Sequence, residues 1–326
     1  MTRIAASLAA LLLATAVSGC DGSGAEPDAP SDGARATLIL DFQANAVHAG
    51  IYAALAEGFA SDRGVDLEVQ EPGASTDAPK LLRAGRAELA VMDISDLAIA
   101  RERGADLVAV GALVQRPLAA VIAGDPGAVR TPADLSGRTV GVTGLPSDDA
   151  VLAAVVDSSG GVPPPETVTI GFDSVAALTS GRVDAATAFW NAEGVALRRA
   201  GVDTREFRVD DFGAPAYPEL VLVTTRERLD ADRDEIAAIV AALREGYELA
   251  ARDPDAALDD LLAAVPSLDR ATMSAQLRAL GDAFDPPMAL DRPTLERWAA
   301  WAQRYGIVSE RPEVDRAFDF EIAGGV

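Results

Sequence analysis

Short apolar runs alternate with amphipathic segments over most of the chain. The runs are typical of buried strands, and segments in which apolar residues recur every three or four positions are typical of helices. The first half predicts strands at 37–42, 65–69, 89–92 and 107–114, separated by helices at 48–61, 78–84 and 95–103. This order predicts an open, mostly parallel sheet with helices on both faces.

The same cycle starts again after the turn sequence DPG at 125–127. The second half predicts a helical turn at 131–135, strands at 139–143, 168–170 and 183–189, and helices at 148–159, 174–180 and 193–200. One more strand is predicted at 220–224, and the pattern from 232 to 304 is almost purely helical. Pro254, Pro266 and Pro286 interrupt that region because proline cannot continue a helix.

Two sheet-forming cycles followed by a helical tail predict an α/β protein with two lobes. We expect lobe one to comprise residues 37–120 and 222–326, and lobe two to comprise residues 121–221. The chain is expected to cross between the lobes near 119–124 and 218–224. Ligands of open α/β sheets bind outside the carboxyl ends of the strands, so a cleft between the lobes is the expected binding site. Binding would close the lobes by a hinge motion.

The first twenty residues have the features of an export signal. Arg3 precedes an apolar run at 4–17, which is too short to span a bilayer comfortably, and small residues lead to Cys20. We predict a signal peptide at 1–19, a lipid on Cys20 and a flexible tether at 20–36. The folded part is then extracytoplasmic and anchored to the cell membrane. An ordinary signal peptide that happens to contain a cysteine is the alternative.

Composition narrows the classes of function further. Cys20 is the single cysteine, which leaves no internal disulfide and no cysteine-based metal site. The chain has 28 Lys and Arg against 51 Asp and Glu, a formal net charge of −23. This balance, without a basic stripe or an aromatic-rich platform, argues against nucleic-acid binding and is typical of a solvated acidic surface. We predict a monomer that holds no metal and no cofactor.

Several segments resemble the NMT1/THI5-like group of proteins. Residues 40–52, LDFQANAVHAGIY, are similar to that group's LDWxPNxxHxGxY, and residues 58–67, GFASDRGVDL, are similar to its GYFxxxGLDV. AELAVM at 87–92, DLSGRTVGV at 134–142 and SGRVDAA at 180–186 also follow the group's general pattern. The resemblance covers nearly the whole chain after the export signal.

The resemblance implies a periplasmic-binding-protein-like fold and a non-enzymatic role in an ABC import system, with a permease and an ATPase as partners. The group contains binders of thiamine pyrimidine precursors, of riboflavin and of sulfonates. It also contains an enzyme that makes the thiamine pyrimidine, which uses a histidine as substrate, a Schiff-base lysine and a cysteine-rich iron-binding motif. Here the single lysine, Lys80, lies well past the His48 helix in sequence, and there is no cysteine cluster, which argues against that enzyme. A ligand-sensing lipoprotein is a further alternative.

Candidate ligand-binding residues of lobe one lie between the first strand and the first helix, and they are Asp41, Phe42, Asn45 and His48. Asn45 offers donors and acceptors to a heterocycle, and Phe42 stands where the group usually has a Trp as a stacking face. For His48 the alternative is a first-turn helix residue that bonds only to the backbone.

Two further strand-to-helix junctions carry polar candidates. Asp93 and Ser95 occupy the first, where Ser95 can equally be a simple helix N-cap. Ser147 lies in a turn of lobe two that precedes a helix, and such turns can bind anions. Asp148 and Asp149 at the helix start partly neutralise its dipole, which argues against a strongly anionic ligand.

Three last candidates follow later strands. Trp190 is predicted as a second stacking face, and Tyr217 lies where the chain returns to lobe one. The resemblance implies that Glu193 accepts hydrogen bonds from an exocyclic amine or ring N–H, and a first-turn Glu that favours the helix dipole is its alternative. Aromatic rings with carboxylates, and no arginine clamp near these motifs, predict a flat nitrogen heterocycle. A thiamine-related aminopyrimidine is the preferred ligand, with riboflavin or another small organic solute as the alternative.

Overall fold

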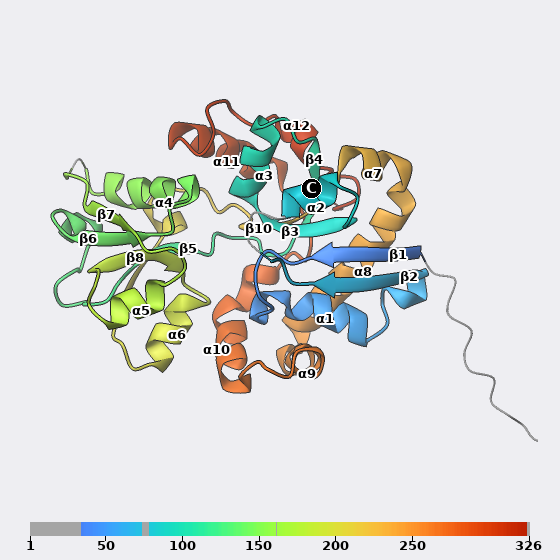
Figure 1. Ribbon diagram of the computed structural model, residues 1–326, viewed down its shortest axis with the longest axis horizontal. Helices are drawn as coiled ribbons and strands as arrows, with labels where there is room; N and C mark the ends of the chain where they lie inside the picture. The colour runs from blue at the N-terminus through green and yellow to red at the C-terminus, as the bar shows by residue number, and fades with distance from the viewer. Residues whose placement is uncertain (1–33, 74–77, 161, 325–326) are drawn as a thin grey trace, which may run out of the picture. The chain divides into compact units, whose positions relative to one another are not determined.

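The computed structural model describes residues 34–73, 78–160 and 162–324. The predicted signal peptide, Cys20 and most of the predicted tether therefore lie outside the described residues. The described chain forms two five-stranded sheets with helices against both faces of each sheet (Figure 1). We call them the first sheet and the second sheet.

The first sheet has the strand order β2-β1-β3-β10-β4. Its strands are β1 (Ala34–Ile39), β2 (Val65–Gln70), β3 (Leu89–Asp93), β4 (Leu107–Ala112) and β10 (Leu220–Thr225). β1 pairs in parallel with β2 and β3, whereas β10 runs antiparallel to both of its neighbours. Four of the five strands therefore run the same way, and the strand that returns from the second sheet runs against them.

The second sheet repeats this arrangement with the order β7-β6-β8-β5-β9. Its strands are β5 (Ala119–Ala123), β6 (Thr139–Val142), β7 (Glu166–Thr169), β8 (Ala185–Phe189) and β9 (Arg205–Arg208). β5 is its antiparallel strand and lies between β8 and β9. Each sheet is thus mixed, and its one reversed strand is the first strand that the chain forms on arriving from the other sheet.

Three details differ from the sequence prediction. Residues 34–36, predicted as tether, belong to β1, because the Ala34 amide donates to the Gly64 carbonyl at 3.0 Å and Ala36 is fully buried. Residues 119–123, predicted only as a crossing, form β5 in the interior of a sheet. β9 was not predicted because Phe207 is the single apolar residue in REFR, and an edge strand needs few.

Helices cover both faces of the first sheet, which explains the continuous apolar runs of β3, β4 and β10. In β1, Leu38 packs on one face and Ile39 on the other, as the two-residue repeat of a strand requires. One face carries α1 (Ala49–Ala56), α8 (Arg233–Arg252), α9 (Pro254–Ala264) and α10 (Arg270–Leu280). The other carries α2 (Ala78–Arg83), α3 (Ile94–Glu102), α11 (Arg292–Arg304) and α12 (Val314–Ala317), and α7 (Arg226–Ala231) follows β10.

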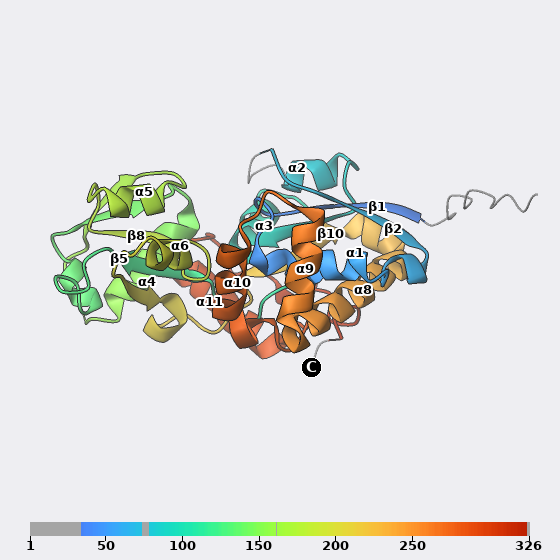
Figure 2. The ribbon, with the colours of Figure 1, turned by 90° about the horizontal axis from the view of Figure 1, so that it is seen from below.

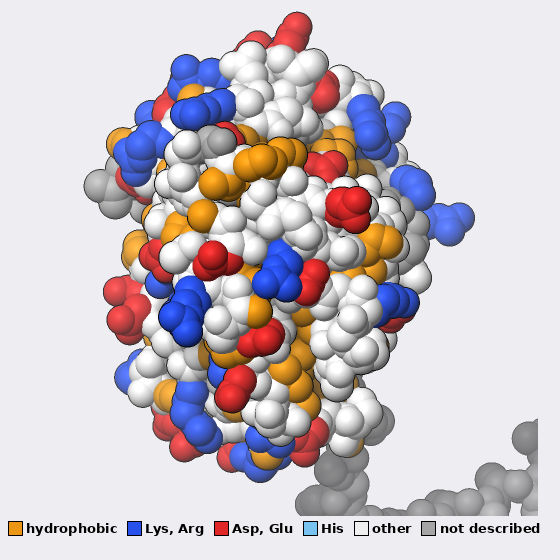
Figure 3. Space-filling model, turned by 90° about the vertical axis from the view of Figure 1, so that its left-hand side faces the viewer, with side chains coloured by type: hydrophobic (Ala, Val, Ile, Leu, Met, Phe, Trp, Pro, Cys, Tyr) orange, Lys and Arg blue, Asp and Glu red, His pale blue; other side chains and the backbone are white. Residues whose placement is uncertain are grey.

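The second sheet has fewer helices, which Figures 1 and 2 show on its two sides. α4 (Pro146–Asp157) covers one face, and α5 (Ser174–Thr179) and α6 (Glu193–Arg199) cover the other. Short 3-10 helices complete the chain: η1 (Ala46–His48), η2 (Ser61–Arg63), η3 (Pro132–Leu135), η4 (Val209–Phe212) and η5 (Gly281–Phe284). On the face in Figure 3, basic and acidic side chains are intermixed. Among the described helices, none combines the length and apolar character that crossing a bilayer requires.

The helical tail is fixed to the first sheet by a close crossing of α8 and α1. A Cβ added to Gly246 would lie 2.0 Å from the carbonyl oxygen of Gly50, so the two backbones touch where a side chain has no room. A Cβ added to Gly50 would lie 2.5 Å from the Tyr247 ring, and the Tyr247 hydroxyl donates to the Val47 carbonyl at 2.9 Å. The tail thereby holds η1, which carries His48, against the end of β1.

We expect Gly246→Ala to lower the free energy of unfolding by about 1–3 kcal/mol, because the added methyl group forces the two helices apart. Chemical denaturation monitored by circular dichroism measures this. Glu248→Ala, at an exposed position of the same helix, is the control and should change the free energy by less than about 0.5 kcal/mol. A Gly246→Ala protein as stable as the Glu248→Ala protein would contradict the role given to this crossing.

Candidate functional site

A cavity of about 670 Å³ lies between the two sheets. Its walls are formed largely by the segments that follow β1, β3, β6, β7 and β8, together with parts of α2, α3 and α10. These strands are the parallel ones, and the carboxyl ends of parallel strands are where open α/β sheets place their ligands. Of the predicted site residues, those that line the cavity are Asp41, Phe42, Asn45, Asp93, Ser147 and Glu193.

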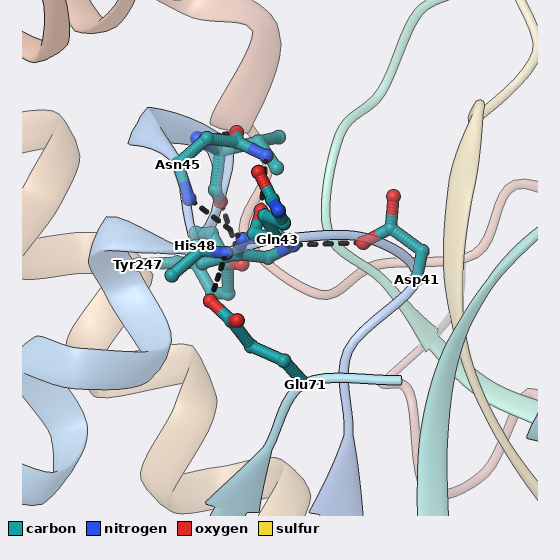
Figure 4. A network of polar contacts seen from close by, with 8 residues as sticks. Asp41, Gln43, Asn45, His48, Glu71 and Tyr247 are labelled. Carbon is teal, nitrogen blue, oxygen red and sulfur yellow. Dashed lines mark hydrogen bonds and ion pairs between the residues drawn. The ribbon is translucent and has the colours of Figure 1, made fainter. Parts of the chain in front are cut away.

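His48 does not line the cavity but holds Asp41, which does. Its Nε2 lies 2.8 Å from Asp41 Oδ1, and its Nδ1 accepts a hydrogen bond from the Asn45 amide at 3.2 Å (Figure 4). Because Nδ1 accepts, the ring proton sits on Nε2 and is donated to the Asp41 carboxylate. His48 is fully buried, so its predicted contact with a ligand is wrong in this structure and its role is to orient Asp41.

Asn45 begins the helical segment that follows β1. Its Oδ1 accepts from the Val47 amide at 3.0 Å, and its Nδ2 donates to the Gln43 carbonyl at 3.0 Å. Glu71 at the end of β2 accepts from the Ala44 amide at 2.8 Å and fixes the same loop (Figure 4). Asn45 therefore shapes the wall through the backbone, and its second Nδ2 hydrogen makes no hydrogen bond to another described residue.

Two carboxyl groups, the half-buried Asp93 and the buried Glu219, lie where the two sheets meet, and Asp93 lines the cavity. Glu219 Oε2 accepts from the amides of Leu118 and Ala119 at 2.8 and 3.1 Å, so Glu219 is the better placed to be ionised. Burial and the neighbouring Glu219 carboxylate raise the pKa of Asp93 well above its usual range, and Asp93 is hydrogen-bonded to that carboxylate. Asp93 also caps α3 by accepting from the Ser95 amide at 2.6 Å. Ser95 is buried and does not line the cavity.

Asp96 adds a third carboxyl group to this wall. Burial, with smaller contributions from Asp93 and Asp41, raises the pKa of Asp96 to about 7, although Arg103 acts in the opposite sense. Lys80, Arg83 and Arg103 line the cavity as well. The sequence motifs contain no arginine clamp, yet the fold brings these three cations from α2 and α3 to the site, so the cavity carries both signs of charge.

Ser147 and Glu193 approach the cavity from the second sheet. Ser147 lies in the first turn of α4, where Asp148 Oδ2 accepts from the Thr143 amide at 2.6 Å and fixes the preceding loop. Glu193 opens α6 and accepts from the Phe189 amide at 3.0 Å. Burial raises the pKa of Glu193 above its usual value. Both side chains occupy the positions that the strand-to-helix junctions predicted.

Trp190 and Tyr217 are corrections to the predicted site. The indole N–H of Trp190 donates to the Pro117 carbonyl at 2.9 Å, and the Arg208 guanidinium lies 4.1 Å from the ring centroid. Trp190 is 1% exposed, so its ring has no face for a ligand. Tyr217 is buried too, with its ring centroid 5.5 Å from that of Trp301. The Trp190 ring is thus covered by Arg208, and the Tyr217 ring packs against the aromatic rings of α11.

The structure supplies a different aromatic pair. Phe42 and Phe172 line the cavity, and they are two of the large apolar side chains that remain well exposed, at 44% and 61%. Their ring centroids are 5.9 Å apart with planes tilted by 39°. A third ring stacked between them would need a separation of about 9 Å, twice the usual minimum centroid distance. Phe172 follows Gly171 shortly after β7, so its position after a strand was a signal for a residue at the site.

Two further residues were missed, Asn191 and Gln276. Asn191 lies in the turn between β8 and α6, and Gln276 lies on α10, and both line the cavity although they are almost completely buried. Asn191 is adjacent to Trp190, so its position after a strand was a usable signal. Gln276 lies in the helical tail, and nothing in its local sequence separates it from a surface glutamine.

Comparison with known proteins places this geometry in a family. The NMT1/THI5-like family model matches residues 45–257. This chain belongs to the NMT1/THI5-like family. A formylaminopyrimidine-binding protein of Halalkalibacterium halodurans is 33% identical over 227 residues, 69% of each chain. A 4-amino-5-hydroxymethyl-2-methylpyrimidine phosphate synthase of Legionella pneumophila is 24% identical over 242 residues, 72% of this chain and 75% of the synthase.

Solved structures show that the NMT1/THI5-like chain has the expected fold. The periplasmic aliphatic sulphonate-binding protein SsuA of Escherichia coli superposes on this chain with a TM-score of 0.72. The superposition covers 89% of this chain and 99% of the SsuA chain. Sequence identity between the two is 16%, so this likeness concerns the fold alone. The predicted α/β, periplasmic-binding-protein-like architecture is confirmed.

The raised pKa of Asp96 predicts a pH dependence of stability. Between pH 4 and pH 7 the folded protein holds a proton on Asp96 that the unfolded chain releases, so the free energy of unfolding falls as the pH rises through this window. Replacing Asp96 by Asn removes this contribution. Urea titrations at successive pH values measure the free energy of unfolding of both proteins. As the pH rises to about 7, the wild type should lose stability relative to Asp96→Asn, and above that pH the difference should stay constant. Asp230→Asn, at an exposed position, is the control, and a pH-independent difference for Asp96→Asn would contradict the assignment.

Proposed function

We propose that this protein is the solute-binding component of an ABC import system and that its solute is a thiamine-related aminopyrimidine. The observation that carries the proposal is a cavity between two sheets, at the carboxyl ends of their parallel strands, in a chain 33% identical to a formylaminopyrimidine-binding protein. Riboflavin and other small organic solutes are the alternative ligands of the same site.

The polar groups of the cavity support a solute rich in N–H donors. Asp41 is held as an acceptor by His48, and Glu193 and Asp148 line the cavity from the second sheet. An aminopyrimidine offers an exocyclic amine to such groups and a flat face to apolar side chains. The exposed rings of Phe42 and Phe172 stand too close together to enclose it, so they cover the solute at one edge.

A clamp mechanism is supported by the way the chain passes between the sheets. It crosses before β5 and again before β10, and Glu219 bonds one crossing to the other. Two short crossings permit one sheet with its helices to turn against the other about Glu219. Closing on the solute would exclude water and strengthen each hydrogen bond inside the cavity.

Binding without catalysis is our proposal for the chemistry. The family includes synthases, but the single histidine of this chain is buried and bonded to Asp41, and the single cysteine lies at position 20. Among the described residues, no group of three His, Cys, Asp or Glu side chains is arranged to hold a metal ion. Lys80 lines the cavity, but the buried His48 does not.

The proposed cellular setting is outside the cytoplasm. A lipid on Cys20 would hold the protein at the membrane, and a tether ending before β1 would let it reach a permease with its ATPase. We propose that it acts as a monomer. A sensor lipoprotein could use the same clamp, and genes for a permease and an ATPase beside this one would favour import.

The ligand proposal is tested by isothermal titration calorimetry with formylaminopyrimidine, its unformylated amine, riboflavin and an alkyl sulfonate. We expect a pyrimidine to bind most tightly and Glu193→Ala to lose about 1.5–3 kcal/mol, roughly ten- to hundredfold in affinity. Glu227→Ala, in the first turn of α7, is the matched control and should bind like wild type. A phosphate ester should bind more weakly because Asp148 repels it. Tighter binding of the sulfonate or the ester would overturn the heterocycle while leaving a solute-binding role intact.

The anchor proposal is tested on the full chain expressed in its host. Cys20→Ser should abolish lipid attachment, so that the protein leaves the detergent phase in a phase-partition assay and its N-terminal peptide lacks a lipid mass. Ser18→Ala, two residues earlier, is the control and should stay lipidated. Wild-type protein found in the aqueous phase without a lipid adduct would rule out the anchor.

A further inference from the structure

Two exposed aromatic rings meet at the edge of the cavity. Among the described residues, the large apolar side chains that remain well exposed are Phe42, Val168 and Phe172. Phe42 and Phe172 line the cavity, and their ring centroids lie 5.9 Å apart. Neither ring is part of the two hydrophobic cores that join the sheets to their helices. Packing of the fold therefore does not explain why phenylalanine stands at these two positions.

The two rings come from different sheets. Phe42 follows β1 of the first sheet, and Phe172 follows β7 of the second. The loop of Phe42 is fixed on both sides of the ring, because Asp41 is bonded to His48 and the Ala44 amide donates to Glu71. The contact between the rings thus joins one sheet to the other across the cavity edge.

The loop of Phe172 is fixed to the second sheet in the same way. Before the ring, the Ile170 amide donates to the Val142 carbonyl of β6 at 2.8 Å. After it, the Ala177 amide of α5 donates to the Asp173 carbonyl at 2.8 Å. Since both loops are held by their own sheets, the rings separate when the sheets move apart or when a side chain rotates.

The ring contact favours the arrangement in which the two sheets stand close together. Aromatic pairs at such centroid distances attract each other beyond the effect of area burial, by an amount that shifts an equilibrium roughly two- to tenfold. The contact runs directly from ring to ring, so a solute is not needed to form it. Opening the cavity at this edge must break the contact.

We propose that Phe42 and Phe172 form a gate that holds the two sheets together at the cavity edge and opens for a solute to enter or leave. This inference rests on the proposed solute-binding function and adds what controls exchange at that site. Because the same contact must break for entry and for exit, the gate lowers the association and dissociation rate constants together. The dissociation constant then changes less than either rate constant.

The first test needs no solute. A reporter cysteine replaces Ala119, which lines the cavity and is 9% exposed, in a chain that also carries Cys20→Ser. Adding Phe172→Ala should speed alkylation of the reporter by a maleimide about two- to tenfold, because the cavity opens more often. Val168→Ala, at an exposed position of β7 that does not line the cavity, is the matched control and should leave the rate unchanged. Equal alkylation rates in these two variants would overturn the gate.

The pairing of the two rings is tested by combining substitutions. Phe42→Ala should speed alkylation of the reporter as much as Phe172→Ala does, and the double variant should be no faster than either, because one change already breaks the contact. Effects that multiply in the double variant would show that the rings act independently and would overturn the gate.

The second test is stopped-flow measurement of formylaminopyrimidine binding. Phe172→Ala should raise both the association and the dissociation rate constant at least twofold, while Val168→Ala leaves both unchanged. A ring that only covers the bound solute slows dissociation and does not affect association. An association rate constant that stays unchanged in Phe172→Ala would therefore overturn the gate.

The two proposals fail in different ways. If wild type binds formylaminopyrimidine and Phe172→Ala changes neither the alkylation rate nor the association rate constant, the gate is wrong and the proposed function stands. If wild type does not bind formylaminopyrimidine, the aminopyrimidine proposal is wrong. The alkylation rates of the reporter then decide the gate without a solute.

Discussion

The carboxylate of Glu219 is the interaction on which the arrangement of the two sheets depends. It is buried between them and accepts hydrogen bonds from the amides of Leu118 and Ala119 and from the side chain of Asp93. Leu118 belongs to one crossing of the chain and Glu219 to the other, and β5 and β10 begin at the next residues, Ala119 and Leu220. Burial raises the pKa of Glu219, and the amide donors of the other crossing offset the cost of burying this carboxyl group, so the bonds of Glu219 hold the two crossings together.

The contact between the two crossings also positions one wall of the candidate site. The Ile94 amide donates to the Glu219 carbonyl at 2.9 Å, which fixes the start of α3 and with it the wall that carries Asp93 and Asp96. The opposite end of the site is fixed separately, by His48 bonded to Asp41 and by Tyr247 bonded to Val47. Hydrogen-bonding groups of the wall are thus oriented before any solute arrives, which lowers the entropy that binding must overcome.

Much of the fold followed from the sequence, because strands buried on both faces read as short apolar runs. The two crossings of the chain between the sheets were predicted, but the apolar run at 119–123 was interpreted as a crossing only and not as the strand β5. β9 was missed because its sequence, REFR, is polar. At the site, junctions between strands and helices located Asp41, Asp93, Ser147 and Glu193 at the cavity.

Burial at the site could not be read from the same junctions. Trp190 and Glu193 both lie shortly after β8, but only Glu193 lines the cavity. The Trp190 ring points inward, where its N–H donates to the Pro117 carbonyl and Arg208 covers its face. Gln276 and the cations of α2 and α3 reach the cavity only through tertiary packing, which short-range patterns do not encode. The position of a residue after a strand therefore predicts that it lies near the site, but long-range contacts decide whether its side chain points into the cavity.

The strand order of the first sheet has a consequence for the order of assembly. β4 hydrogen-bonds only to β10 within that sheet, and β10 ends at Thr225, more than a hundred residues later in the chain. Until that segment has emerged, β4 has no partner strand and the first half of the polypeptide has no complete sheet. An early portion that cannot finish folding stays without a complete core until the later segment has been made, so the order of synthesis delays compaction of the whole protein.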